Sequence, residues 1–273
     1  MGLLRVRMFC LADSHIVCQK DQAVGELNQV LDLIEYVALV LGYKAGENYR
    51  YRLSLGDRKD TKKYYKDDEA WDYAENVLRD VLIQRKANYF EAEKEAAFYG
   101  PKIDIQMKNV AGKEDTAFTV QYDFVMPKRF KLSYIDRDGK EKEPIVIHRS
   151  SIGAIERTMA FLIEHYAGAF PVWLAPVQVK VIPVADRHLD YARKLVTDLK
   201  SQGVRAEVDD RPERMNLKIR QAQLEKIPYM LIIGDKEEAD NSVSVRRRSG
   251  EQLPTQSLTT FLETLTAEIT SKV

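Results

Sequence analysis

Residues 144–157 read PIVIHRSSIGAIER, and this stretch decides the fold of the first half of the chain. The β-branched run Ile145–Ile147 predicts a short strand, which ends at the polar residue His148. Gly153 is predicted to open an amphipathic helix whose first turn carries Arg157. A strand that delivers a histidine and a helix that delivers an arginine can direct both side chains into one cleft. Such a cleft suits a metal ion beside a polyanionic substrate.

The composition is that of a globular protein without a large excess of charge. The chain has 273 residues, of which 45% are hydrophobic, and its 42 basic residues balance 42 acidic ones. Any contact with a nucleic acid would therefore depend on a local patch. The two cysteines are too few for a disulfide framework, and no apolar run reaches the ~18–20 residues that span a bilayer. We expect a cytoplasmic protein that does not enter a membrane.

The first 170 residues predict an antiparallel sheet with helices beside it. Apolar residues at helical spacing indicate long helices at about 21–41 and 67–85. Short strands without intervening helices after Tyr89 indicate antiparallel pairing. The expected strands are 3–10, 49–55, 89–92, 102–109, 117–124, 130–136 and 144–148. A turn is expected at 12–15, and a helix at 153–167 closes this unit.

The second half of the chain alternates strands and helices. The segment 168–176, with two prolines and a glycine, is the best candidate for a linker. Residues 176–273 then predict a small α/β domain with a mostly parallel sheet. Its expected elements are strands at 177–184, 204–208 and 229–233, a hairpin at 242–248, and helices at 189–201, 216–226 and 258–269.

Three groups of residues could carry chemistry, and each has a simpler explanation when it is taken alone. His15 and His148 lie far apart in the sequence, and a single histidine at a strand end is more often a satisfied polar residue than a ligand. The Gly-Pro turn before Lys102 presents Tyr99 on its other side, yet the lysine could simply be solvated. Strand alternation directs Gln121 and Asp123 to one sheet face, which could face either a ligand or water.

Taken together, these segments resemble the threonyl-tRNA synthetase family of class II aminoacyl-tRNA synthetases over essentially the entire chain. Several matching blocks in the right order are more specific than any one of them. The blocks are LRVRMF at 4–9, DSHIVC at 13–18, AFYGPKID at 97–104, VQYDF at 120–124, IHR at 147–149 with Glu156-Arg157, EHYAG at 164–168, WLAPVQV at 173–179 and PYM at 228–230.

The resemblance implies an α/β fold in two domains. Residues 1–170 would be a partial class II catalytic domain, from motif 2 through motif 3, with an incomplete antiparallel α+β sheet. Residues 176–273 would be an α/β anticodon-binding domain. Motif 1 would lie upstream of Met1, as would the cysteine expected as third zinc ligand. We therefore expect a chain truncated before motif 1, without the interface of the homodimer expected for the family.

The implied function is that of a threonine–tRNA ligase, which activates threonine as threonyl-adenylate and transfers it to tRNA(Thr). His15 and His148 would be zinc ligands, and Asp13, Tyr99 and Gln121 would contact threonine. Zinc is a sensible choice because threonine and valine are near-isosteres that an apolar pocket separates poorly. A site that needs a hydroxyl to complete a metal's coordination rejects valine much more strongly.

The resemblance also assigns the nucleotide and RNA contacts. Arg157 would clamp a phosphate of ATP through its bidentate guanidinium, Lys102 would add charge beside the adenylate, and Mg²⁺ would accompany ATP. A basic loop and helix in the second domain would anchor the tRNA phosphates, although a solvated charged helix is the simpler explanation. The implied tRNA-binding residues are Arg211, Arg214, Lys218 and Arg220.

Two alternatives remain open at this stage. The chain could be a catalytically inactive tRNA-binding or regulatory relative that keeps the synthetase scaffold. ATP–pyrophosphate exchange driven by threonine would distinguish the two. A zinc hydrolase built on His15 and His148 lacks a local third ligand and a general base. Thr116 and Phe118 stand where the family pattern has polar residues, and so does the pair at 11–12.

Overall fold

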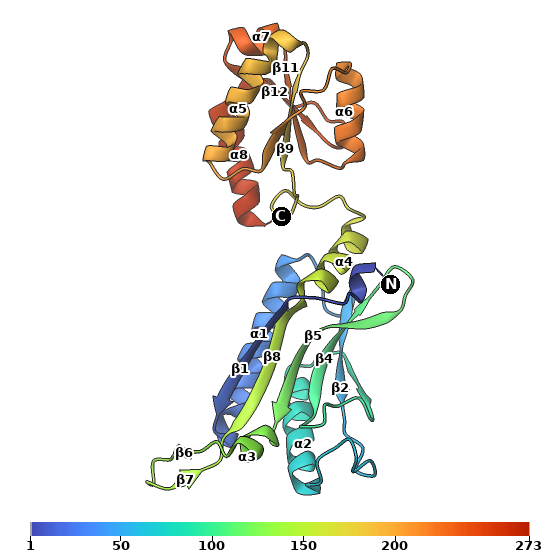
Figure 1. Cartoon of the computed structure of the whole chain (residues 1–273), viewed down its shortest axis with the longest axis vertical. Helices are drawn as coiled ribbons and strands as arrows, with labels where there is room; N and C mark the ends of the chain where they lie inside the picture. The colour runs from blue at the N-terminus through green and yellow to red at the C-terminus, as the bar shows by residue number, and fades with distance from the viewer. Residues whose placement is uncertain (1, 273) are drawn as a thin grey trace. The chain divides into compact units, whose positions relative to one another are not determined.

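The computed structural model describes residues 2–272, which form two compact units (Figure 1). The first unit reaches His165 and the second begins at Tyr166. The strands of the first unit are β1 Leu11–Cys18, β2 Tyr49–Ser54, β3 Tyr89–Ala92, β4 Lys102–Lys108, β5 Glu114–Asp123, β6 Tyr134–Ile135, β7 Glu141–Lys142 and β8 Ile145–Ala154. Its helices are α1 Ala23–Val40, α2 Asp68–Gln84, α3 Met126–Phe130 and, at the boundary between the units, α4 Ile155–Tyr166.

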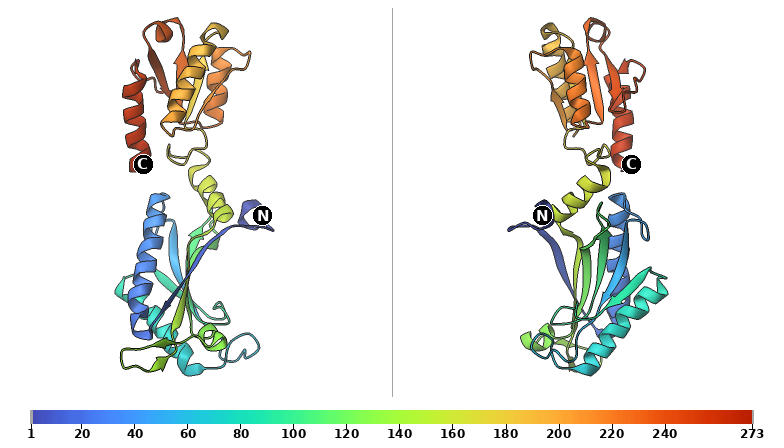
Figure 2. Two further views of the ribbon diagram at one scale, coloured as in Figure 1. Left: turned by 60° about the vertical axis from the view of Figure 1, so that its left-hand side comes forward. Right: turned by 90° about the vertical axis from the view of Figure 1, so that its right-hand side faces the viewer.

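Six of these strands form one sheet in the order β1-β8-β5-β4-β2-β3. Neighbouring strands are antiparallel except β2 and β3, which are parallel and are joined by a crossover through α2. Helices α1 and α2 contact each other and pack on one face of the sheet, as Figure 2 also shows. The other face of the central strands is therefore left to polar side chains.

The two long helices follow from their sequence. Leu27, Leu31 and Ile34 of α1 recur at helical spacing and are fully buried. Helix α2 begins after Asp67, whose carboxylate accepts a hydrogen bond from the amide of Ala70 at 3.1 Å. Such a cap satisfies an amide that has no partner within the helix. Both helices lie where the sequence predicts them.

The first strand is wrongly placed by the sequence prediction. Residues 3–10 contain only a short 3₁₀ helix at Gly2–Leu4 and no strand, and β1 instead occupies the predicted turn at 12–15. Strand β1 begins where β8 offers a partner, because Leu11 lies opposite Ala154, the last residue of β8. Backbone donors and acceptors of a strand need a neighbour, so an alternating pattern alone does not form one.

The predicted start of the last helix of this unit is also wrong. Strand β8 continues through Gly153, and α4 begins only at Ile155. Gly153 has φ +70°, and a Cβ at this position would lie 2.0 Å from the carbonyl oxygen of Ala117. The glycine therefore permits a close approach between β8 and β5. Arg157 still falls in the first turn of α4, as predicted.

The strand predicted at 130–136 is reduced to two residues in the structure. Helix α3 ends at Phe130, and β6 has only two residues, which pair with β7 in a separate hairpin. Pro127 occupies the first turn of α3, where its fixed φ suits a helix. Phe130 and Ile135 are mostly exposed, so burial does not favour a longer strand here.

The second unit is a mixed sheet between helices. Its strands are β9 Val179–Pro183, β10 Ala206–Val208, β11 Tyr229–Ile233, β12 Ser242–Arg247 and β13 Gln256–Ser257. Its helices are α5 Leu189–Ser201, α6 Met215–Leu224, α7 Asp235–Ala239 and α8 Leu258–Ser271. The strand order is β10-β9-β11-β12-β13, with β9, β10 and β11 parallel and the rest antiparallel.

Alternation along β9 explains the layers of this unit. Val179 and Val181 join the core formed with α5 and α8, whereas Ile182 joins the core formed with α6 on the other face (Figure 1). The predicted α/β fold class is confirmed. The short helix α7 was not predicted. No helix within residues 2–272 is long and apolar enough to cross a membrane.

The close approach at Gly153 gives a testable prediction. Gly153→Ala should destabilise the first unit by more than about 3 kcal/mol, because its Cβ would collide with a backbone oxygen and its φ disfavours a side chain. Gly139→Ala is the matched control, since its φ is +76° but no atom lies within 4 Å of an added Cβ. It should cost about 1 kcal/mol. Urea unfolding followed by circular dichroism measures both losses, and equal losses would contradict the close approach.

Candidate active site

A row of side chains crosses four neighbouring strands on the polar face of the first sheet. His15 of β1 lies opposite His148 of β8. His148 lies opposite Gln121 of β5, which lies opposite Lys102 of β4. Directly opposed residues on one sheet face have neighbouring side chains. The structure thus brings together four predicted site residues that the sequence separates widely.

The two histidines are in direct contact. The ring centroids of His15 and His148 are 4.5 Å apart, and the rings meet edge to face. Tyr99 stacks on His148 with a centroid distance of 4.9 Å, and its hydroxyl donates a short hydrogen bond to the Gln121 side-chain oxygen. Burial raises the pKa of Tyr99 to about 12, and the charges of Asp123 and Asp13 act in the same direction. Tyr99 is therefore a neutral hydrogen-bonding group at pH 7.

A buried carboxylate supports the histidine pair. Asp123, at the end of β5, has no exposed surface, and its Oδ2 lies 2.7 Å from His148 Nε2. Metal-binding histidines usually donate a hydrogen bond to such a group from the N–H of their second ring nitrogen. The donor set thus fits zinc in part, with two adjacent imidazoles, one of them oriented by a carboxylate. A zinc site with an open position takes three protein ligands, and residues 2–272 offer no cluster of three.

A second row lies two residues further along the strands. Asp13 is opposite Ser150, Ser150 opposite Thr119, Thr119 opposite Asp104, and Asp104 opposite Arg52. Asp13 is exposed and lies at the β1 edge of this row. On each strand the residue of the second row is two positions from the residue of the first row. Side chains two positions apart point to the same face of a sheet, so both rows face the same side. The side chain of Asp13 therefore faces the same space as those of the two histidines.

Asp104 is the charge centre of the second row. Its carboxylate is fully buried, and its Oδ2 accepts hydrogen bonds from Lys102 at 2.8 Å, Arg52 at 2.9 Å and Ser54 at 2.7 Å. Thr119 donates to Oδ1 at 2.9 Å. Burial alone would raise the pKa of Asp104, but the charge and hydrogen bond of Lys102, with the hydrogen bonds of Arg52 and Ser54, hold that pKa below its usual value. Two cations are thereby fixed around one ionised carboxylate.

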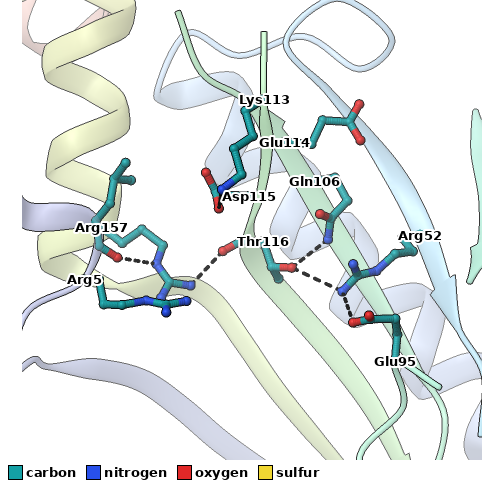
Figure 3. A pocket seen from close by; sticks show the side chains of 10 residues that line it. Arg5, Arg52, Glu95, Gln106, Lys113, Glu114, Asp115, Thr116 and Arg157 are labelled. Carbon is teal, nitrogen blue, oxygen red and sulfur yellow. Dashed lines mark hydrogen bonds and ion pairs between the residues drawn. The ribbon is translucent and has the colours of Figure 1, made fainter. Parts of the chain in front are cut away.

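A cavity of about 440 Å³ continues from Arg52 toward helix α4 (Figure 3). Ligand sites typically have this size. Arg157 is fixed at its rim, donating to the carbonyl oxygens of Thr116 at 2.9 Å and Leu4 at 3.3 Å. The charged lining residues are four cations and three carboxylates, namely Arg5, Arg52, Lys113, Arg157, Glu95, Glu114 and Asp115. The predicted ATP residue Arg157 lines this cavity, whereas Lys102 lies in the histidine row.

The predicted tRNA residues of the second unit do not form one exposed cluster. Arg214 and Arg220 are exposed beside or on α6. Arg211 makes a bidentate ion pair with Asp209 at 2.6 and 2.8 Å, which lowers the pKa of that carboxyl. Lys218 differs from the expectation, because it is buried and donates to the Asp209 carbonyl oxygen at 3.0 Å. Lys218 therefore supports the loop from within rather than facing a ligand.

Asp104 and Arg52 carry no role in the sequence-based prediction, and Asp123 is predicted only to share a sheet face with Gln121. Alternation gives a signal for two of them, because Asp104 follows Lys102 by two positions and Asp123 follows Gln121 by two. Their burial and hydrogen bonds depend on which strands pair, and that pairing is not visible in the local pattern.

Comparison with known proteins identifies the family. Residues 1–166 match the tRNA synthetase class II core domain (G, H, P, S and T), and residues 178–268 match an anticodon binding domain. The chain belongs to the class II aminoacyl-tRNA synthetases of this group. Among them it resembles threonine–tRNA ligases: it is 51% identical over 271 residues to the enzyme of Clostridium botulinum (strain Eklund 17B / Type B). That match covers 99% of this chain and 42% of the relative.

Other relatives of the chain are also threonine–tRNA ligases or threonyl-tRNA synthetases. The threonine–tRNA ligase of Staphylococcus carnosus (strain TM300) is 49% identical over 272 residues, again over 99% of this chain and 42% of the relative. The chain thus spans less than half the length of these relatives. A crystal structure of the RNA binding domain of threonyl-tRNA synthetase from Cryptosporidium parvum superimposes with a TM-score of 0.89 at 32% identity, covering 98% of this chain and 66% of that one. A putative threonyl-tRNA synthetase from Aeropyrum pernix gives 0.79 at 29%, covering 100% and 66%.

The carboxylate at Asp104 gives a second prediction. Asp104→Asn should cost about 3 kcal/mol of stability at pH 7, because two cations lose their buried counter-charge. Because the pKa of Asp104 is lowered in the folded state, its carboxylate stabilises the fold fully when the pH is above the pKa of the unfolded chain, about 3.9. This stabilisation is lost as the pH falls through the pKa of the folded state. The difference in the free energy of unfolding between wild type and variant should therefore be constant near neutrality and shrink below about pH 4.

Urea unfolding at a series of pH values measures this difference. Asp80→Asn, which changes an exposed carboxylate on α2, is the matched control and should change stability by less than about 0.5 kcal/mol. A difference that widens on acidification would contradict the ionised, ion-paired state of Asp104.

Proposed function

We propose that this chain carries part of a threonine–tRNA ligase, with the amino-acid and ATP sites in residues 1–170 and an anticodon-binding domain in residues 176–273. The reaction is ATP-dependent formation of threonyl-adenylate followed by transfer of threonine to tRNA(Thr), which suits a cytoplasmic enzyme. One observation carries the proposal: a row of two histidines, a glutamine and a lysine lies on the same sheet face as a charged, ATP-sized cavity.

The amino acid would bind over the histidine row. Asp13 would accept a hydrogen bond from the threonine hydroxyl, Tyr99 would lie near the ammonium, and Gln121 would line the pocket. His15 and His148 would hold zinc, which when bound would take the substrate hydroxyl and so distinguish threonine from valine. The hydrogen bond that already joins Tyr99 to Gln121 would limit the reorganisation needed on binding.

ATP would occupy the cavity beside α4. Arg157 and Arg52 are each held by hydrogen bonds before any ligand arrives, so their charges need no rearrangement to receive phosphates. Lys102 would stand between the two sites, close to the point where the threonine carboxylate attacks the α-phosphate and pyrophosphate leaves. The carboxylates of Glu114 and Asp115 in the lining offer the oxygen ligands that Mg²⁺ prefers.

A threonine-driven ATP–pyrophosphate exchange assay tests this proposal. Threonine should support exchange, and valine should support it far less. Asp13→Asn should lower kcat/KM for threonine by about 10- to 100-fold, because one charge-assisted hydrogen bond is lost, while Asp80→Asn should leave it unchanged. Absence of exchange by a folded chain that still binds tRNA would overturn the catalytic proposal and favour a non-catalytic tRNA-binding protein.

The RNA surface of the second unit gives a separate prediction. Arg214 and Arg220 present exposed charges at one side of the sheet, where α6 lies. Arg220→Gln and Arg214→Gln should each weaken tRNA binding and reduce the slope of log K against log salt by about 0.7. Arg193→Gln on α5, which covers the opposite face, should leave the slope unchanged. A reduction with Arg193→Gln alone would contradict the assigned surface.

A further inference from the structure

The carboxylate of Asp123 has all of its partners inside the protein. Its Oδ1 accepts hydrogen bonds from two backbone amides, those of Val125 at 2.9 Å and Met126 at 2.8 Å, at the start of α3. Its Oδ2 lies 2.7 Å from Nε2 of His148. With no exposed surface, Asp123 does not reach a substrate. Asp123 therefore reaches the site through its contact with His148, besides its charge, which helps to raise the pKa of Tyr99.

These contacts determine where the imidazole proton lies. An ionised carboxylate can only accept a hydrogen bond, so the close nitrogen of His148 must carry a hydrogen. A neutral His148 then has its proton on Nε2 and its lone pair on Nδ1. We propose that Asp123 is a positioning residue that fixes His148 in this tautomer and leaves Nδ1 as its ligating atom. The consequence for metal binding rests on the zinc site of the proposed function.

The ring orientation is fixed as well as the tautomer. Tyr99 stacks on one side of the His148 ring at an interplanar angle of 28°, and the ring of His15 meets it edge to face. Together with the hydrogen bond to Asp123, these contacts restrict rotation of the imidazole. A ring that is held this way loses less entropy when it binds a ligand.

One substitution should change the tautomer of His148 without changing the fold. In Asp123→Asn, the side-chain oxygen should stay on the amides of Val125 and Met126, because the new NH₂ group cannot accept their hydrogen bonds. The NH₂ group must then point at His148 Nε2, which becomes an acceptor. The imidazole proton moves to Nδ1, so the substitution reverses the tautomer while it preserves the start of α3.

The test is NMR of the metal-free full chain with ¹⁵N-labelled histidine. Wild type should show His148 as the Nε2–H tautomer, and Asp123→Asn should show Nδ1–H, with the Val125 and Met126 amide shifts retained. Asp80→Asn should match wild type. Titration with Zn²⁺ should then show affinity lowered by about 10- to 100-fold in Asp123→Asn.

The outcomes separate this inference from the proposed function. An unchanged tautomer in the folded Asp123→Asn variant would overturn the role of Asp123, even if wild type binds zinc. A reversed tautomer with undiminished zinc affinity would overturn Nδ1 as the ligating atom. A reversed tautomer in a chain whose wild type binds no zinc would uphold the positioning role and reject the zinc site of the proposed function.

Discussion

The antiparallel pairing of β8 between β1 and β5 is the constraint on which the site depends. It places His148 beside His15 on one side and beside Gln121 on the other. A shift of one residue in this register would turn the whole polar row toward α1 and bury it in the core. The core prevents such a slip, because Ile145 and Ile147, which point to the other face of β8, are buried. The apolar residues of β8 thus hold its catalytic candidates in place.

Buried carboxylates organise the polar face that this pairing creates. Asp104 holds Lys102 and Arg52 between the histidine row and the charged cavity, and Asp123, at the end of β5, contacts His148 of the neighbouring strand β8. Charged groups that are fixed before a ligand arrives need not reorganise during a reaction. The histidine row and the charged cavity are linked by the same strands, so their geometry is set by one sheet.

The sequence predicts much of this, and its failures have physical causes. The helices α1 and α5 follow from apolar spacing, and the motif blocks correctly bring His15, His148, Gln121 and Tyr99 to one place. Local alternation could not show that β1 needs β8 as its partner, so the first strand was predicted too early. The local pattern predicts a helix start at Gly153, because the close contact of this glycine with Ala117 involves a distant strand. Lys218 looked exposed because a charged residue on a helix usually is.

The central claim is that the β1–β8–β5 register builds one ligand site. The most direct measurement is the NMR spectrum of the histidine imidazole rings, of which the chain has four. On addition of a non-hydrolysable threonyl-adenylate analogue, the resonances of His15 and His148 should shift together and share a ring-to-ring nuclear Overhauser effect, while that of His188 in the second unit stays unchanged. Shifts at His188 alone, or no Overhauser effect between His15 and His148, would contradict the account.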